Sequence, residues 1–341
     1  MRYLLALVAS LSIVLGSISS AQAFDRAKLF DAYLSVVMVR GYNTNGGLAY
    51  GSGVVVADNK VITNCHVLRA TKQPWISRGE DSYAVVTVQA DRWHDLCLVT
   101  TDQMPFKPAT LGKSTDLKRG QEIVSIGNSN GVPAPLTSSG IIKGMYDADA
   151  GKIIRTSAKF AMGASGSGLF DLDGRLIGIN TFKTAGKSSA FFFSLPIEWL
   201  SILEKQPIET ALPIEGKALW EEDEDKKPFY MQAAVPEARE DWLKLAEVAS
   251  KWSVAEPKSP DAWFALGVAD ENISKNSEAE KAYRRAVELD SSYADALVRI
   301  GVIAKEKGDT VEMHRINLKL AEIDPDIAAQ YSDLLGCGPQ C

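Results

Sequence analysis

The sequence predicts a multidomain protein in which an all-β domain is followed by an all-α helical repeat domain. From about Leu34 to Leu195, short runs rich in β-branched and aromatic residues alternate with Gly, Asn, Asp and Pro, which is typical of short strands joined by turns. Beyond Glu237 the composition becomes helical, and similar residues recur at a spacing of 34. With 341 residues, the chain is long enough for two domains of ordinary size.

The first 23 residues have the pattern of an export signal. Arg2 is followed by the apolar run LLALVASLSIVLG and by the small-x-small cleavage site Ala21-Gln22-Ala23, so we expect the mature chain to begin at Phe24. The alternative is an uncleaved membrane anchor, although the apolar run is short for a span. No later segment is apolar over the roughly 20 residues that a span needs, so we expect no stable membrane insertion after signal cleavage.

The charge balance is acidic. The chain has 37 Lys and Arg against 43 Asp and Glu, and loss of residues 1–23 removes only Arg2 among them, which leaves a net charge of −7. A nucleic-acid-binding protein needs a basic face. We therefore expect no nucleic acid as a partner.

Residues 24–205 are predicted to form the β domain. Its candidate strands are residues 34–42, 48–58, 60–64, 83–91, 95–101, 121–128, 140–146, 152–158, 167–171, 175–182 and 191–196. Strands of this length and spacing favour an all-β barrel or a pair of sandwiches over a βαβ arrangement. A helix from Ile197 to about Lys205 is expected to close the domain.

Residues 206–237 break both patterns. They contain four prolines and the acidic run from Glu221 to Asp225, so we predict a linker.

Residues 238–335 contain the helical repeat. After a shift of 34 positions, WFALG at 263–267 falls on LVRIG at 297–301, and AVELD at 286–290 falls on LAEID at 320–324. The pattern resembles the tetratricopeptide repeat, in which each helix pair leaves an apolar face that the next pair covers. Gly267 and Gly301 are expected to let the paired helices approach closely. A helical bundle without repeats is the alternative.

Three segments of the β half carry residues with catalytic chemistry. The runs GSGVVV and VITN, separated by a short turn, lead to His66, and Asp95 precedes the apolar run LCLV. Ser165 lies in a loop with Gly on both sides, where backbone N–H groups can point together at a developing oxyanion. His, Asp and Ser occur in that order, 29 and then 70 residues apart, and this combination is more specific than any single segment.

These segments resemble the trypsin-like serine proteases of chymotrypsin fold, above all the exported HtrA/Deg type. The resemblance covers about residues 34–200 and implies a double β-barrel. It also implies that Ser165 is the nucleophile, His66 the general base and then acid, and Asp95 the carboxylate that orients His66. The backbone N–H groups of Gly163 and Ser165 would form the oxyanion hole.

The serine loop also departs from the family pattern. Ala164 stands where Asn or Asp is usual, Ser167 replaces a second Gly, and Gly168 stands where Pro is frequent. Ser167 is therefore an alternative nucleophile. His94 is an alternative base, but as the neighbour of Asp95 on an extended segment it is expected to point to the opposite face and to lie at the surface.

The resemblance places a specificity pocket between residues 159–163 and 191–194. Its candidate residues are Lys159, Phe160, Phe192 and Ser194. The run Phe191 to Phe193 would favour small or medium apolar substrate residues, unless alternate Phe rings simply fill the barrel core. Lys159 would favour an acidic residue at the base of the pocket, unless it projects into solvent.

An oxidising compartment permits disulfides among the four cysteines. Cys65 and Cys97 lie beside His66 and Asp95, so we expect a disulfide between them, with two separate buried thiols as the alternative. Cys337 and Cys341, in the tail of residues 336–341, are expected to close a small terminal loop. We expect no metal site, because no His or second Cys pair lies near the tail, and no cofactor.

The sequence therefore predicts an exported serine endopeptidase, periplasmic or secreted, that acts on proteins or peptides through an acyl-enzyme. HtrA/Deg-type proteases usually carry C-terminal PDZ domains, and here residues 238–335 take that place. We expect the helical repeats to recruit a protein substrate or partner, and a purely stabilising role is the alternative. A catalytically impaired pseudoprotease that acts as a binding scaffold is the alternative function.

Overall fold

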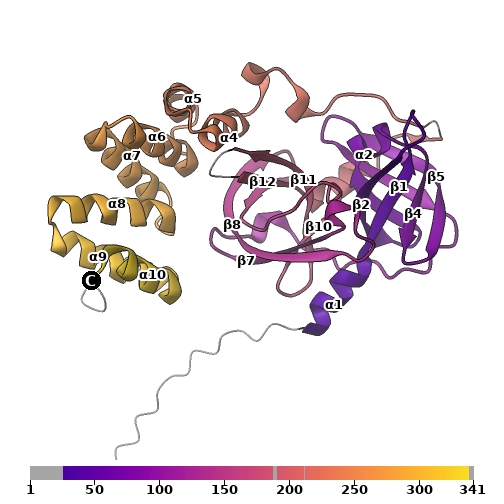
Figure 1. Ribbon diagram of the computed structural model, residues 1–341, viewed down its shortest axis with the longest axis horizontal. Helices are drawn as coiled ribbons and strands as arrows, with labels where there is room; N and C mark the ends of the chain where they lie inside the picture. The colour runs from indigo at the N-terminus through magenta and orange to yellow at the C-terminus, as the bar shows by residue number, and fades with distance from the viewer. Residues whose placement is uncertain (1–25, 187–189, 211, 338–341) are drawn as a thin grey trace, which may run out of the picture.

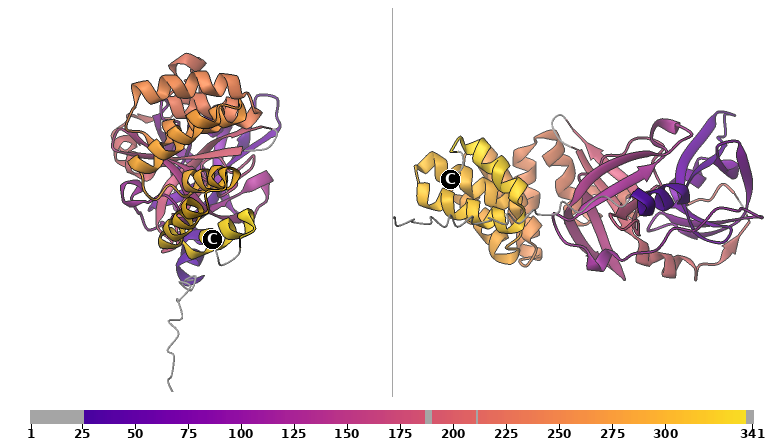
Figure 2. Two further views of the ribbon diagram at one scale, coloured as in Figure 1. Left: turned by 90° about the vertical axis from the view of Figure 1, so that its left-hand side faces the viewer. Right: turned by 90° about the horizontal axis from the view of Figure 1, so that it is seen from below.

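The computed structural model describes residues 26–186, 190–210 and 212–337. The predicted export signal and Cys341 lie outside these residues. Two β-barrels occupy one end of the elongated molecule and a stack of helices the other (Figures 1 and 2). Within the described residues, no helix is both long enough and apolar enough to cross a membrane.

The first barrel has six strands, ordered β5-β4-β1-β2-β3-β6, with β6 pairing back onto β5. Their bounds are β1 Val36–Tyr42, β2 Leu48–Ala57, β3 Lys60–Asn64, β4 Lys72–Arg78, β5 Asp81–Asp91 and β6 Leu96–Thr101. A short strand, β13 (Ile208–Glu209), adds to the outer edge of β5. Val39, Val61 and Ile76 are fully buried in this barrel, as expected for β-branched residues on its inner face.

The second barrel also closes, in the order β10-β11-β12-β9-β8-β7. Its bounds are β7 Glu122–Gly127, β8 Leu136–Ala148, β9 Gly151–Thr156, β10 Gly168–Asp171, β11 Leu176–Ala185 and β12 Ala190–Pro196. A 3-10 turn at Ile197–Trp199 and helix α3 (Leu200–Leu203) follow, where the sequence predicts a helix. The double β-barrel implied by the family resemblance is confirmed.

The C-terminal helices repeat with the predicted period. Their bounds are α4 Phe229–Arg239, α5 Trp242–Ala255, α6 Pro260–Asn272, α7 Asn276–Leu289, α8 Ala294–Lys307, α9 Thr310–Ile323 and α10 Pro325–Leu335. Helices α5, α7 and α9 begin at intervals of 34 residues, as do α6 and α8. A Cβ on Gly267 would lie 2.5 Å from Cε1 of Tyr283 on α7, so this glycine lets α6 and α7 pack closely.

The segment expected to be a linker is ordered, and its last part is helical. Helix α4 begins at Phe229, and its Pro236 lies inside the helix. Residues 214–222, which we call the strap, run from the first barrel toward α4, and Figure 1 shows this part of the chain passing over the barrels. Ile214, Ala218 and Leu219 of the strap are buried, so its apolar residues anchor it despite its acidic composition.

The helices are docked on the second barrel through a shared core. Tyr230 of α4 stacks on Tyr146 of β8 with ring centroids 4.1 Å apart. Arg119, which precedes β7, pairs with Asp261 on α6 at 2.8 Å and with Asp290 at 2.9 Å. Arg119 and Asp261 are almost fully buried, so this ion-pair network is shielded from solvent.

Candidate active site

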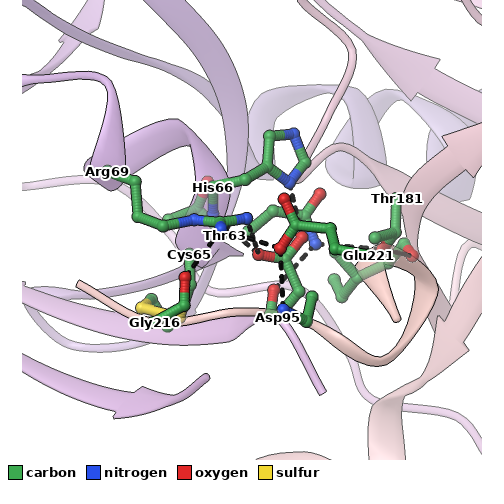
Figure 3. A network of polar contacts seen from close by, with 12 residues as sticks. Thr63, Cys65, His66, Arg69, Asp95, Thr181, Gly216 and Glu221 are labelled. Carbon is green, nitrogen blue, oxygen red and sulfur yellow. Dashed lines mark hydrogen bonds and ion pairs between the residues drawn. A yellow bond between two sulfur atoms is a disulfide. The ribbon is translucent and has the colours of Figure 1, made fainter. Parts of the chain in front are cut away.

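His66 is fixed at the entrance of a short helix. β3 ends at Asn64, and helix α2 (Cys65–Arg69) begins at once, which projects the His66 ring from the rim of the first barrel. The ring is about one-third exposed, with 32% of its side-chain surface accessible. Figure 3 shows Asp95 beneath this ring and Arg69 beside it.

Asp95 is held against His66 by both its backbone and its side chain. Its φ of 54° places it in the left-handed region, one residue before β6. Its Oδ2 lies 2.5 Å from Nδ1 of His66, and its Oδ1 accepts the His66 backbone N–H at 2.7 Å. The carboxylate is 1% exposed, and burial raises the pKa of Asp95 against the opposing effect of His66. The structure therefore brings the first two predicted site residues together.

A disulfide joins the two segments that carry this pair. Cys65 and Cys97 are bonded, with 5.0 Å between their Cα atoms, so the predicted disulfide is confirmed and the alternative of separate thiols is excluded. Cys97 pairs with Thr63 in the β3–β6 ladder. The predicted partner of Cys337 is Cys341, which lies outside the described residues, so that bond stays a prediction.

The Ser165 loop lies against the strands that lead to His66. The Ser165 carbonyl accepts the N–H of Ser52 at 2.8 Å. A Cβ on Gly166, whose φ is +86°, would overlap the Ser52 carbonyl and the Thr63 hydroxyl, so only glycine fits this approach. Ser165 is half-buried, and among the described residues no hydrogen bond joins it to the His66 ring.

The loop presents two unpaired backbone donors. The N–H of Ala164 bonds to the carbonyl of Ala161 at 3.0 Å, and Gly163 has a φ of +90°, the pattern of a type II turn. The Met162 carbonyl accepts the Asn130 N–H, and in a planar trans peptide the Gly163 N–H points the opposite way. Neither the Gly163 nor the Ser165 N–H has an acceptor within the described part of the chain. These two N–H groups are therefore available to donate hydrogen bonds to an oxyanion.

Ser167, the alternative nucleophile, and His94, the alternative base, lie in different surroundings. Ser167 is fully buried, and its hydroxyl accepts a hydrogen bond from Asn180 at 2.8 Å. His94 differs from the expectation of a surface position, because only 15% of its side chain is exposed. Its ring nitrogens lie 2.7 Å from Asp91 and 3.0 Å from Asp149, and its ring packs on the buried Trp199 ring with centroids 4.0 Å apart.

The predicted pocket residues divide into two groups. Phe160 and Phe192 are buried and contact each other with ring centroids 5.0 Å apart, in a small cluster with Ala164. Lys159 is exposed, which favours the expectation that it projects into solvent. Ser194 is fully buried and donates to the Asn180 side chain, so it faces the barrel interior.

Residues of the strap that the sequence did not single out also reach the site. The Trp220 ring meets the His66 ring edge-on at 6.4 Å and stacks on Phe182 of β11 at 5.2 Å. Glu221 accepts a hydrogen bond from Arg69 at 2.7 Å. Partial burial works to raise the pKa of Glu221, but the hydrogen bonds from Arg69 and from the Ala218 N–H, together with the charge of Arg69, outweigh burial and lower the pKa. Only the acidic run marked this segment in the sequence, and it pointed to a linker.

Among the described residues, no group of three or more His, Cys, Asp or Glu side chains is placed to hold a metal ion.

Comparisons with known proteins match the β half of the chain. Residues 51–179 match the model of the trypsin-like peptidase domain. Protease Do-like 1, chloroplastic, from Arabidopsis thaliana is 32% identical over 161 residues, which cover 43% of this chain and 37% of that protein. A probable periplasmic serine endoprotease DegP-like from Halomonas elongata is 32% identical over 156 residues, covering 43% and 33%.

Solved structures of HtrA-type proteases are also similar. The HtrA-type protease AlgW with tripeptide is 27% identical, with 52% of this chain and 61% of that chain covered at a TM-score of 0.46. The chain spans about a third of the length of the curated relatives named above. Residues 51–179 thus match the trypsin-like peptidase domain, and the β half of the chain is similar to DegP-like serine endoproteases.

Proposed function

We propose that this protein is an exported serine endopeptidase that cleaves protein or peptide substrates through an acyl-enzyme. The observation that carries the proposal is the buried Asp95 carboxylate bonded to Nδ1 of His66, next to a loop that holds Ser165 and two unpaired N–H groups. The similarity to serine endoproteases supports peptide-bond hydrolysis. The periplasmic relative and the signal-like sequence of residues 1–23 support export.

Each residue has a defined role in the proposed reaction. His66 takes the proton of Ser165 as the hydroxyl attacks the substrate carbonyl, and returns it to the leaving amine. Asp95 holds the proton on Nδ1 of His66, so that the other ring nitrogen faces the serine. The N–H groups of Gly163 and Ser165 bind the oxyanion, and each such donor contributes about 3 kcal/mol to the transition state in comparable enzymes.

A catalytically impaired scaffold is the second candidate. It is favoured by the absence of a hydrogen bond between Ser165 and His66 within the described residues. Such bonds are often long in free enzymes and tighten when substrate binds. Both candidates therefore need a direct test of the nucleophile.

A fluorophosphonate probe provides that test. We expect labelling of the full mature chain, loss of labelling in Ser165→Ala, and retention in Ser167→Ala. Labelling that is lost only in Ser167→Ala would assign the nucleophile to the alternative serine. No labelling of the wild type, together with no hydrolysis of casein or of a peptide library, would favour the scaffold.

We further propose that the helical repeats recruit protein substrates or a protein partner. A cleft of about 610 Å³ between the second barrel and helices α8 and α10 supports this role, and Val298 and Leu334 contribute apolar surface to it. We expect Val298→Arg to slow cleavage of casein without changing cleavage of short peptides. The matched control is Val311→Arg, because Val311 is 79% exposed on α9. If both variants cleave casein at the same rate, the repeats do not recruit substrate through this cleft and a stabilising role remains.

A further inference from the structure

Trp220 lies at the candidate site although it belongs to the strap. Its ring contacts both the His66 ring and Phe182, and it is only partly buried. The match to the peptidase domain ends at residue 179, so Trp220 comes from outside the matched region. A second part of the chain therefore completes the wall beside His66.

The strap is fixed to the segments that carry the catalytic pair. Arg69, at the end of α2, donates to Glu221 at 2.7 Å and to the Gly216 carbonyl at 2.8 Å. The Leu219 N–H donates to the carbonyl of Trp93 at 2.9 Å, two residues before Asp95. Trp220 stands between these anchors, so its position is tied to that of His66.

The next strand offers an edge for an extended peptide. β10 pairs with β11 only as far as Ile179, and at Asn180 the Ser165 loop takes over, because the Gly166 N–H donates to the Asn180 carbonyl. Beyond Asn180, this edge of β11 receives no backbone hydrogen bond from any described residue. A peptide paired along this edge would run past Ser165.

The two faces of β11 and β12 carry separate aromatic clusters. Phe192 contacts Phe160 on one face, whereas Phe193 stacks on Phe182, which in turn stacks on Trp220. Successive side chains of a strand point to opposite faces of its sheet. A peptide added to the edge would therefore direct one side chain to the first cluster and the adjacent side chain to the second.

We propose that Trp220, stacked on Phe182 and held by the Arg69–Glu221 pair, is a specificity-determining residue that selects a large apolar side chain on the substrate. The selected residue is the neighbour, in the substrate sequence, of the one held by the Phe160–Phe192 cluster. This inference rests on the proposed protease function and names the substrate class of the same site.

The test measures kcat/KM of wild type and of Trp220→Ala on pairs of peptides. The two peptides of a pair differ only by Leu or Ala at one position near the cleaved bond, and each flanking position is tested in turn. Wild type should prefer Leu at one flanking residue, and loss of the apolar wall should reduce this preference about tenfold or more in kcat/KM. Trp220→Phe should restore most of it. Both variants should still be labelled by the fluorophosphonate, because the probe carries no such side chain.

Trp75→Ala is the matched control, since Trp75 lies on β4 of the first barrel and its ring packs on Tyr42 of β1. It should keep the wild-type preference. An unchanged Leu preference in Trp220→Ala overturns the inference, and so does an equal rate increase on all peptides, which would mean that Trp220 obstructs the site. A wild type without labelling or hydrolysis overturns the proposed function and the inference with it, whereas active variants with unchanged preference overturn the inference alone.

Discussion

Reduction of the Cys65–Cys97 disulfide should destabilise the fold more than it disturbs the site. The bond closes a loop with a sequence separation of 32. Chain entropy in the unfolded state then gives about 3.7 kcal/mol of stabilisation for such a loop. This is a large fraction of the stability of an ordinary domain.

The proposed catalytic pair, His66 and Asp95, has a second support that survives reduction. The β3–β6 ladder contains five residue pairs, from Lys60↔Thr100 to Asn64↔Leu96. β3 ends two residues before His66, and β6 begins directly after Asp95. We therefore expect reduced protein to be labelled by a fluorophosphonate as fast as oxidised protein when no denaturant is present.

The assay is urea unfolding followed by tryptophan fluorescence, with and without reductant. It should use a Cys337→Ser/Cys341→Ser background, so that only the bond between Cys65 and Cys97 is reduced. The expected loss is about 3 to 4 kcal/mol of unfolding free energy. An unchanged unfolding free energy would refute the entropic reasoning. Loss of labelling with unchanged circular dichroism would show that the disulfide itself sets the site geometry.

Three further substitutions test the packing of the helices. Arg119→Met leaves the buried Asp261 without its closest cation, and should lower the unfolding free energy by about 3 to 5 kcal/mol in urea titrations; a loss under 1 kcal/mol would contradict the network. Gly267→Ala places a methyl group against Tyr283, and should cost about 1 to 3 kcal/mol in thermal unfolding; an unchanged melting temperature would mean that α6 and α7 separate freely. Burial raises the pKa of Glu237, so its ionisation opposes folding. Glu237→Gln should therefore have a higher unfolding free energy than wild type at neutral pH, and this difference should shrink as acid protonates Glu237 in the wild type. A difference that grows in acid would contradict a raised pKa of Glu237.

Local patterns in the sequence predicted most of the β half. Each candidate strand overlaps an observed one, because apolar alternation and turn residues are local signals. β4 was missed, since KQPWISR contains Pro74 and few residues typical of strands. Helix α1 (Arg26–Ser35) was also missed, and it is held to the barrels mainly by Leu29 and Ala32. Its apolar positions are too few to mark it before the barrel surface is known.

The site was predictable in its residue types and not in its surroundings. His66 and Asp95 are marked by the strands beside them, and the structure joins them. The inward position of His94 depends on Trp199, which packs on its ring from a distant part of the sequence, and no local pattern reveals this contact. The same applies to Ser167, whose burial depends on Asn180.

The strap shows that composition alone does not reveal how a segment packs. Prolines and acidic residues favour a solvated linker when their neighbours are unknown, but Glu221 faces the cation of Arg69 and Trp220 faces Phe182. The next element, α4, packs Tyr230 against Phe193 on β12, the strand that pairs with β11. The apolar core therefore runs without a break from the second barrel into the helices, so the helices share the packing that positions the free edge of β11 beside Ser165. A shift of α4 would therefore act through this core on the β11 edge, where we propose that the substrate pairs, whereas a flexible linker would transmit no such shift.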